Sequence, residues 1–213
     1  MNFSDTFRTG LAHLTTRQRF AFPANAVPGH FRSSAVLLAF WSDGDDILTA
    51  FIQRPRTMSR HAGQVALPGG LLEQGESWVE AALREAEEEV GIDPSTAQVI
   101  GLLDDAWTGA GNHIVPVVAW LEDAPNLTPN PAEVTEIFVP RVSDLMKTES
   151  RQEKVVTLKG KQYIDHILSW PGGRAIGPTA DMMLEALDRA NGQTPSRGEQ
   201  RLRELLAYTG QGD

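Results

Sequence analysis

The stretch that most constrains this chain runs from the glycine pair Gly69 and Gly70 to Gly91. After the glycine turn, Ser77 and Glu80 have the spacing of a capping box, in which each side chain accepts a hydrogen bond from the other residue's backbone N–H. Gly91 is typical of the residue just past a helix, where a positive φ is favoured. The pattern therefore predicts a glycine turn followed by a helix between Ser77 and Gly91.

The predicted helix has an apolar face and an acidic face. At about 100° per residue, one apolar stripe should face the core. Its members are Val79, Ala82, Leu83, Ala86 and Val90. Glu85, Glu88 and Glu89 share an arc of about 100° away from that stripe. Like charges at this spacing destabilise a helix by about 0.2–0.5 kcal/mol per pair, and they face the unfavourable pole of the helix dipole. We expect a cation such as Mg²⁺ to offset them, although an ordinary solvated acidic face is the alternative.

The spacing of this stretch resembles the signature of the Nudix hydrolases. Gly70 is followed after five residues by Glu76, and after seven more by the run from Arg84 to Ile92. Every defined position of the signature is matched, and Ala86 and Ile92 meet two of its apolar requirements. By this resemblance the chain is identified as a member of the family.

The resemblance implies an α/β fold, the Nudix α/β/α sandwich with a mixed β-sheet and a loop-helix-loop catalytic motif. It also implies an enzyme that hydrolyses a diphosphate bond in a nucleoside diphosphate derivative by attack of water on phosphorus, with Mg²⁺ or Mn²⁺ as cofactor. By position, Glu85, Glu88 and Glu89 are the implied metal ligands, and Glu88 or Glu89 is implied to orient or deprotonate the water. Arg84 is implied to brace these glutamates. Glu76, together with the Gly91 named above, is implied to support the motif.

A basic segment lies directly before the glycine turn. It contains Arg54, Arg60 and His61, and guanidinium groups can bind two phosphate oxygens at once. We therefore predict that these three residues bind substrate together with Gly69 and Gly70. The alternative is that they are ordinary solvated charges.

This basic segment also resembles a motif that precedes the signature in the coenzyme A pyrophosphatase branch of the family. Arg54 and Gly63 match the motif, and Ile176–Ala180 resembles a later motif of the same branch. The departures are Pro55, Ser59 and Leu67. Ser59 matters most because it stands where the branch has a second arginine, although Arg60 is adjacent.

The branch resemblance implies that coenzyme A or an acyl derivative is split into adenosine 3′,5′-bisphosphate and (acyl) 4′-phosphopantetheine. Because Ser59 departs from the motif, a pyrophosphatase acting on ADP-ribose or another nucleotide sugar or dinucleotide is the alternative. A non-catalytic nucleotide-binding domain is less expected, since every acidic position of the signature is intact.

Composition narrows the class of protein further. The chain has 213 residues, of which 41% are hydrophobic, enough for one domain with an extension. A net charge of −9 argues against a nucleic-acid partner. The absence of cysteine excludes disulfides and thiolate catalysis. No segment has the length of a membrane span or the pattern of a secretory signal. We expect a cytoplasmic protein whose partner is a small nucleotide, and a homodimer is compatible with the family.

The rest of the chain alternates between strand and helix patterns. Strands are predicted at residues 34–41, 47–53, 98–103, 114–121, 133–140, 154–158 and 162–170, and helices at 143–146, 179–190 and 199–208. The expected organisation is an N-terminal helical extension (1–30), a Nudix domain (31–190) and a C-terminal helix and tail (191–213).

Single residues outside the motif carry four further predictions. Pro116 predicts an edge strand or a bulge. Glu133 is a candidate extra metal ligand or general base. Trp107, in a predicted loop, is expected in the core, with stacking on adenine as the alternative, and His113 is expected in a turn.

Overall fold

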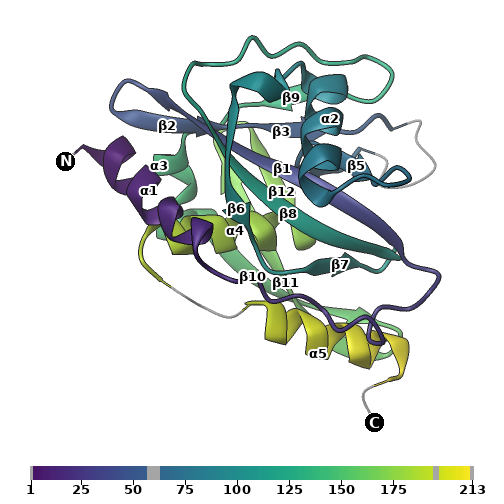
Figure 1. Cartoon of the computed structure of the whole chain (residues 1–213). Helices are drawn as coiled ribbons and strands as arrows, with labels where there is room; N and C mark the ends of the chain where they lie inside the picture. Colours follow the sequence, from purple (N-terminus) through teal and green to yellow (C-terminus); the bar gives the residue numbers. More distant parts are fainter. Residues whose placement is uncertain (1, 57–62, 194–196, 212–213) are drawn as a thin grey trace.

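The computed structural model describes residues 2–56, 63–193 and 197–211 (Figure 1). The strands of the main sheet are β1 (Arg32–Asp43), β2 (Asp46–Thr49), β5 (Gly69–Leu71), β6 (Ala97–Leu102), β7 (Ala106–Thr108) and β8 (Asn112–Leu121). Their order is β2-β1-β8-β6, and β5 and β7 pair with β1 and β8, respectively. β1 and β8 are parallel, whereas the other pairs in this sheet are antiparallel. The mixed sheet that was predicted is therefore present.

Helices cover both faces of this sheet. They are α1 (Phe3–Ala12), α2 (Trp78–Val90), α3 (Val142–Leu145), α4 (Pro178–Ala190) and α5 (Arg197–Thr209), with short 3₁₀ turns η1 (His13–Thr15), η2 (Pro94–Thr96) and η3 (Thr148–Ser150). Side chains alternate along a strand, so Leu37 packs with Ala82 and Ala86 of α2 on one face, while Leu38 and Phe40 join the core that contains α1 and α4. Figure 1 shows α2 on one side of the sheet and α1 with α4 on the other. The α/β/α sandwich is confirmed.

Two smaller sheets complete the domain. One contains β3 (Phe51–Gln53), β4 (Val65–Ala66) and β9 (Glu136–Phe138), and the other contains β10 (Arg151–Leu158), β11 (Lys161–Trp170) and β12 (Gly173–Ile176). β10 and β11 form the hairpin that was predicted, with Lys159 and Gly160 at its turn. Both turn residues have positive φ, 49° and 79°, as the two central residues of a type I′ hairpin turn require.

Most predicted strands differ from the structure by up to three residues at their ends, and two differ more. The strand expected at 47–53 is divided into β2 and β3, which belong to different sheets. The break lies at Ala50, which belongs to neither strand: Thr49 pairs with Phe40 of β1, whereas Phe51 pairs with Phe138 of β9. The strand expected at 133–140 shrinks to β9, because Asn130 accepts the backbone N–H groups of Glu133 and Val134 and forms a turn there.

Pro116 lies in a central strand, since β8 is flanked by β1 and β6. It sits where the β6 pairing has ended at Val117 and the β7 pairing begins only at Ile114. Its carbonyl still accepts the N–H of Leu103 at 3.0 Å. The predicted edge position is therefore wrong, but the proline does occupy an interruption in the ladder, where its missing N–H removes no bond.

The predicted loop before β8 contains the short strand β7. Trp107 lies on it, is 8% exposed, and donates its indole N–H to the carbonyl of Arg201 at 3.0 Å. The expected core role of Trp107 is confirmed. His113 belongs to β8 rather than to a turn, and its Nε2 lies 2.6 Å from the carboxylate of Asp105.

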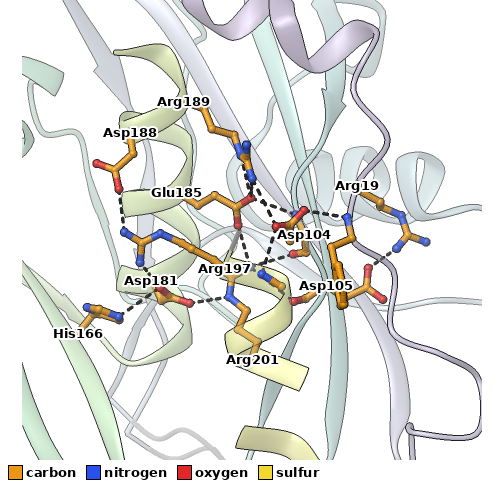
Figure 2. Close-up of polar contacts among 12 residues, drawn as sticks. Arg19, Asp104, Asp105, His166, Asp181, Glu185, Asp188, Arg189, Arg197 and Arg201 are labelled. Carbon is orange, nitrogen blue, oxygen red and sulfur yellow. Dashed lines mark hydrogen bonds and ion pairs between the residues drawn. The ribbon is translucent and has the colours of Figure 1, made fainter. Parts of the chain in front are cut away.

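A network of buried charged side chains connects the segment between β6 and β7 with residues before β1 and with α5 (Figure 2). The carboxylate of Asp104 is fully buried and accepts the backbone N–H groups of Phe20 at 2.8 Å and Gly198 at 3.1 Å. It also pairs with Arg17 and Arg189. The segment between β6 and β7 therefore anchors the segment at Arg17 to Phe20, which precedes β1, and also α5.

The same network joins α4 to α5. Arg201 of α5 donates Nε to Asp181 at 2.6 Å and Nη1 to Glu185 at 2.8 Å, and both acceptors lie on α4. Arg197 pairs with Asp181 and also with Asp188. Figure 2 shows these side chains converging between the two helices. Within the described ranges, no helix is long and apolar enough to cross a membrane.

Candidate active site

Helix α2 begins and ends as its sequence predicts. Ser77 Oγ accepts the N–H of Glu80 at 3.3 Å, and the Glu80 carboxylate accepts the N–H of Ser77 at 2.8 Å, so both halves of the capping box are present. Gly91 has φ of 75° and donates its N–H to the carbonyl of Glu87 at 2.9 Å. These two ends fix the register of the helix and so the direction in which each glutamate points.

The glycine turn lies directly against the glutamates of α2. Gly69 donates its N–H to Glu89 Oε2 at 2.9 Å, and the backbone of Gly70 contacts the carboxylate of Glu85. Both glycines belong to β5, which pairs with β1. The absence of side chains at these two positions lets the carboxylates reach the edge of the main sheet.

Three carboxylates converge at this edge. Glu85, Glu89 and Glu133 each place an oxygen within 4.8 Å of the others. Glu133 comes from the turn before β9, so the site combines one helix with one loop. Three carboxylate oxygens at this separation match the oxygen ligands that hard divalent cations take in proteins.

The electrostatics of Glu89 fit the same interpretation. Its side chain is only 1% exposed. Burial raises its pKa to about 8, against the opposing effects of the Gly69 N–H and Arg54, and the charges of Glu85 and Glu133 raise it further. Burial also raises the pKa of Glu85. A buried carboxylate beside two others needs positive charge, so the residues present fit a divalent cation.

Glu88 is not part of this group. Its side chain is 53% exposed, and its carboxylate lies 3.3 Å from Nη1 of Arg84. Of the three helix glutamates predicted to act together, the structure brings together Glu85 and Glu89 and leaves Glu88 at the rim. Glu89 is buried by the glycine turn, through the N–H of Gly69, and not by the apolar stripe of α2.

Arg84 braces the turn and the helix. Its guanidinium donates two hydrogen bonds to Glu76, at 2.8 and 3.0 Å, and others to Glu85 at 2.9 Å and to the carbonyl of Leu71 at 3.0 Å. The hydrogen bond from Arg84 lowers the pKa of Glu76. Arg84 and Glu76 therefore lie where the resemblance implied that they support the motif.

A cavity of about 920 Å³ lies on the other side of the glycine turn from the carboxylates, which do not line it themselves. Arg54 lines it and reaches Glu89 with Nη1 at 3.4 Å. Gly69 and Gly70 line it as well. The other two predicted substrate-binding residues, Arg60 and His61, lie outside the described residues, as does Ser59. Of the predicted binding residues that the structure describes, all therefore border one cavity.

Most residues that line the cavity were not predicted from the sequence, and three polar ones among them bear on substrate binding. They are Arg32, Asn112 and Arg174. Arg32 lies two residues before the predicted strand 34–41, and extending its alternation would have placed Arg32 on the same face as Val36. Nothing in the sequence pattern singles out Asn112 or Arg174, which reach the cavity only through the packing of separate sheets.

Comparison with known proteins identifies the family. The NUDIX domain model matches residues 30–159. The chain is 30% identical over 209 residues to Nudix hydrolase 22 (chloroplastic) of Arabidopsis thaliana, covering 93% of this chain and 67% of that protein. It is 35% identical over 142 residues to the Nudix hydrolase NudL of Photorhabdus laumondii, covering 66% and 75%. It also shares the fold of a MutT/nudix family protein from Enterococcus faecalis, with a TM-score of 0.53 and 13% identity over 97% of this chain and 80% of that one.

The chain therefore belongs to the Nudix family. It is a pyrophosphohydrolase of that family. Nudix hydrolases generally use divalent metal ions, and the carboxylates of Glu85, Glu89 and Glu133 provide a suitable donor set. The chain spans about two thirds of the length of two plant relatives that it matches, which are 67% and 66% covered.

Proposed function

We propose that the protein hydrolyses the diphosphate bond of coenzyme A or an acyl derivative. The products would be adenosine 3′,5′-bisphosphate and (acyl) 4′-phosphopantetheine. This substrate rests on the coenzyme A branch motifs, and one structural observation supports it above the others. The two segments that resemble those motifs are more than a hundred residues apart in the sequence, yet both line the same cavity.

The first segment contributes Arg54 and Gly63 to the cavity wall, and the second contributes Gly177 and Thr179 from the beginning of α4. The cavity volume of about 920 Å³ lies at the upper end of the range for small-molecule sites, about 300–1,000 Å³. A cavity of this size suits a long substrate with a nucleotide at one end. The carboxylates lie across the glycine turn from it, and Arg54 both lines the cavity and pairs with Glu89.

In this proposal Glu85 and Glu89 would hold Mg²⁺ or Mn²⁺, and Glu88, at the rim, is proposed as a further ligand on the family resemblance alone. When bound, the cation polarises the diphosphate and lowers the pKa of a coordinated water. Glu133 comes from a different element, the turn before β9, and its carboxylate lies within 4.8 Å of both helix glutamates, so we assign to it the proton of the attacking water. As that oxygen bonds to phosphorus, the bridging P–O bond breaks and the phosphate of the leaving fragment keeps the electron pair.

Two arginines would position these groups. Arg54 is only 22% exposed in its side chain and faces both Glu89 and the cavity, so its guanidinium can bind a phosphate oxygen beside the carboxylates. Arg84 would act indirectly, by holding Glu85 through the 2.9 Å hydrogen bond. Arg54 is therefore proposed as a substrate-binding residue and Arg84 as a positioning residue.

Hydrolysis of ADP-ribose or another nucleotide derivative is the second candidate. The observation that favours it is the sequence of the two motifs themselves. Ser59 stands where the branch has an arginine, and Ile176 stands where it has a tryptophan. The first change removes a guanidinium group and the second an aromatic ring, and both groups could bind a nucleotide.

A turnover panel distinguishes these candidates. The purified protein is incubated with Mg²⁺ or Mn²⁺ and with coenzyme A, acetyl-coenzyme A, ADP-ribose, NADH and dinucleoside polyphosphates, and products are identified by mass. We expect the highest kcat/KM for coenzyme A or acetyl-coenzyme A, with adenosine 3′,5′-bisphosphate as product. A higher kcat/KM for ADP-ribose would reject the proposed substrate and support the second candidate.

A further inference from the structure

One wall of the cavity is a single face of β1. Arg32, Ser34 and Val36 all line the cavity, as expected for alternate residues of one strand. The intervening Ala35, together with Leu37, packs in the core beneath α2 instead. Arg32 is thus part of the cavity wall because of the register of β1, and not because a loop happens to pass nearby.

Arg32 lies at a defined separation from the carboxylates. The glycines that contact Glu89 and Glu85 pair with Val36 and Ala35 of β1. Arg32 is therefore three to four residues further along the same strand, which is about 10–13 Å at 3.3 Å per residue. This is too far for the backbone at Arg32 to share the diphosphate site, but it is within the span of a single extended nucleotide.

The Arg32 guanidinium is oriented by a neutral hydrogen-bond partner. Its Nη2 donates to Oδ1 of Asn112 at 3.1 Å, and Asn112 is its cross-strand partner on β8. The backbone N–H of Arg32 donates to Gly111 at 2.9 Å. Among the described residues, no carboxylate lies within ion-pair distance of Arg32. An amide partner fixes the orientation of the cation and leaves its charge and remaining N–H groups available.

We propose that Arg32, oriented by Asn112, binds a second anionic group of the substrate, a phosphomonoester separate from the diphosphate that is cleaved. This inference rests on the proposed function, in which the substrate carries a 3′-phosphate on its ribose. Guanidinium groups are suited to such a dianion because they can donate two parallel hydrogen bonds. Arg32 would thereby determine specificity for substrates that carry this group.

Arg174 is the natural comparison for Arg32. It is also an arginine that lines the cavity, but it comes from β12 and not from β1. Replacing each by glutamine removes the same charge from two different places in one cavity. The two variants, Arg32→Gln and Arg174→Gln, therefore separate a local contact from a general loss of positive potential.

The kinetic test compares coenzyme A with 3′-dephospho-coenzyme A, which differ only in the phosphomonoester. For the unmodified protein we expect a higher kcat/KM for coenzyme A. In Arg32→Gln the ratio of the two kcat/KM values should fall about 10- to 100-fold, the range for one lost charge-assisted hydrogen bond. In Arg174→Gln the ratio should change less than threefold. An unchanged ratio in Arg32→Gln, or a selective loss in Arg174→Gln, would overturn the proposal.

A binding measurement keeps the inference testable if coenzyme A proves not to be hydrolysed. Calorimetry measures the affinity of the same three proteins for adenosine 3′,5′-bisphosphate and for adenosine 5′-monophosphate. We expect the bisphosphate to bind more tightly to the unmodified protein and to Arg174→Gln, and this preference to disappear in Arg32→Gln. Equal affinities in the unmodified protein would reject the assignment of Arg32. Retained preference without turnover of coenzyme A would reject only the proposed substrate.

Discussion

Gly70 is in direct contact with Glu85: a Cβ atom built on Gly70 would lie 2.3 Å from Oε1 of the carboxylate. Such a separation is far below any van der Waals contact, so a side chain at residue 70 must move the Glu85 carboxylate. The glycine is therefore required by the position of a proposed metal ligand and not by the flexibility of the turn.

We expect Gly70→Ala to lower kcat by about 100-fold, since a displacement of about 1 Å at a reacting centre has an effect of that size. The fold should persist, as monitored by circular dichroism. Gly29→Ala is the matched control, because nothing lies within 4 Å of its added Cβ. Activity of Gly70→Ala within about threefold of the unmodified protein would show that Glu85 need not occupy this position.

Replacing Glu89 by glutamine should separate metal binding from folding. Glutamine can still accept the N–H of Gly69, but it cannot supply a negative ligand. We expect turnover to fall by at least about 100-fold and the increase in Tm caused by added Mg²⁺ to disappear. Glu87→Gln, an exposed change on the same helix, is the control. A normal Mg²⁺-dependent rise in Tm in Glu89→Gln would remove Glu89 from the proposed ligands.

Arg84→Lys tests whether the support that Arg84 gives to Glu76 and Glu85 requires a planar guanidinium. Arg84 donates to both oxygens of Glu76 and also to Glu85, and a lysine ammonium cannot reproduce that geometry. We expect kcat to fall about tenfold, with KM changed less than threefold, because the residue positions groups without contacting substrate. A fall confined to KM would instead indicate that Arg84 binds substrate directly.

Asp104→Asn should destabilise the protein. Removing one charge from a buried ion-pair cluster leaves its partners uncompensated, and the effect is about 3–5 kcal/mol in the free energy of unfolding. The partners here are Arg17 and Arg189. Urea unfolding at pH 7 measures the change. Asp45→Asn, which alters an exposed aspartate, provides the control.

The same carboxylate should contribute to acid sensitivity. Burial by itself would raise the pKa of Asp104, but hydrogen bonds from Phe20, Arg17 and Gly198 together lower it below its ordinary value of 3.8. Because the folded-state pKa is the lower one, the stabilisation is complete above the unfolded-state value and is lost as pH falls through the folded-state value. We expect the free energy of unfolding to decline below about pH 4, and to decline less steeply in Asp104→Asn. Parallel pH profiles for the two proteins would contradict this assignment.

Local signals in the sequence were sufficient to predict the central motif. The capping box of Ser77 and Glu80 and the glycine at 91 determine where α2 begins and ends, and these signals depend only on neighbouring residues. The long hairpin of β10 and β11 was predicted for the same reason. The family resemblance then supplied the sandwich, which alternating strand and helix patterns alone do not specify.

Tertiary relationships account for what the sequence pattern did not predict. Helical periodicity places Glu88 and Glu89 on one arc, but only the packing of the glycine turn buries Glu89 and leaves Glu88 exposed. Glu133 was named as a candidate on a strand, whereas Asn130 folds that segment into a turn. Arg32 was missed because its importance depends on which strand lies beside it.

The charge network also bears on when the protein can finish folding during its synthesis. Asp181 and Glu185 on α4 pair with Arg201 on α5. Asp104 accepts the backbone N–H of Gly198, at the beginning of α5. Chains leave the ribosome from their N-terminus, so Asp181 emerges before Arg197 and Arg201, the two arginines of α5 that pair with it. Burying Asp181 early would leave unpaired charge in the interior. We therefore expect Asp181 to stay hydrated until α5 has been made, so that the interface between α4 and α5 forms late in synthesis.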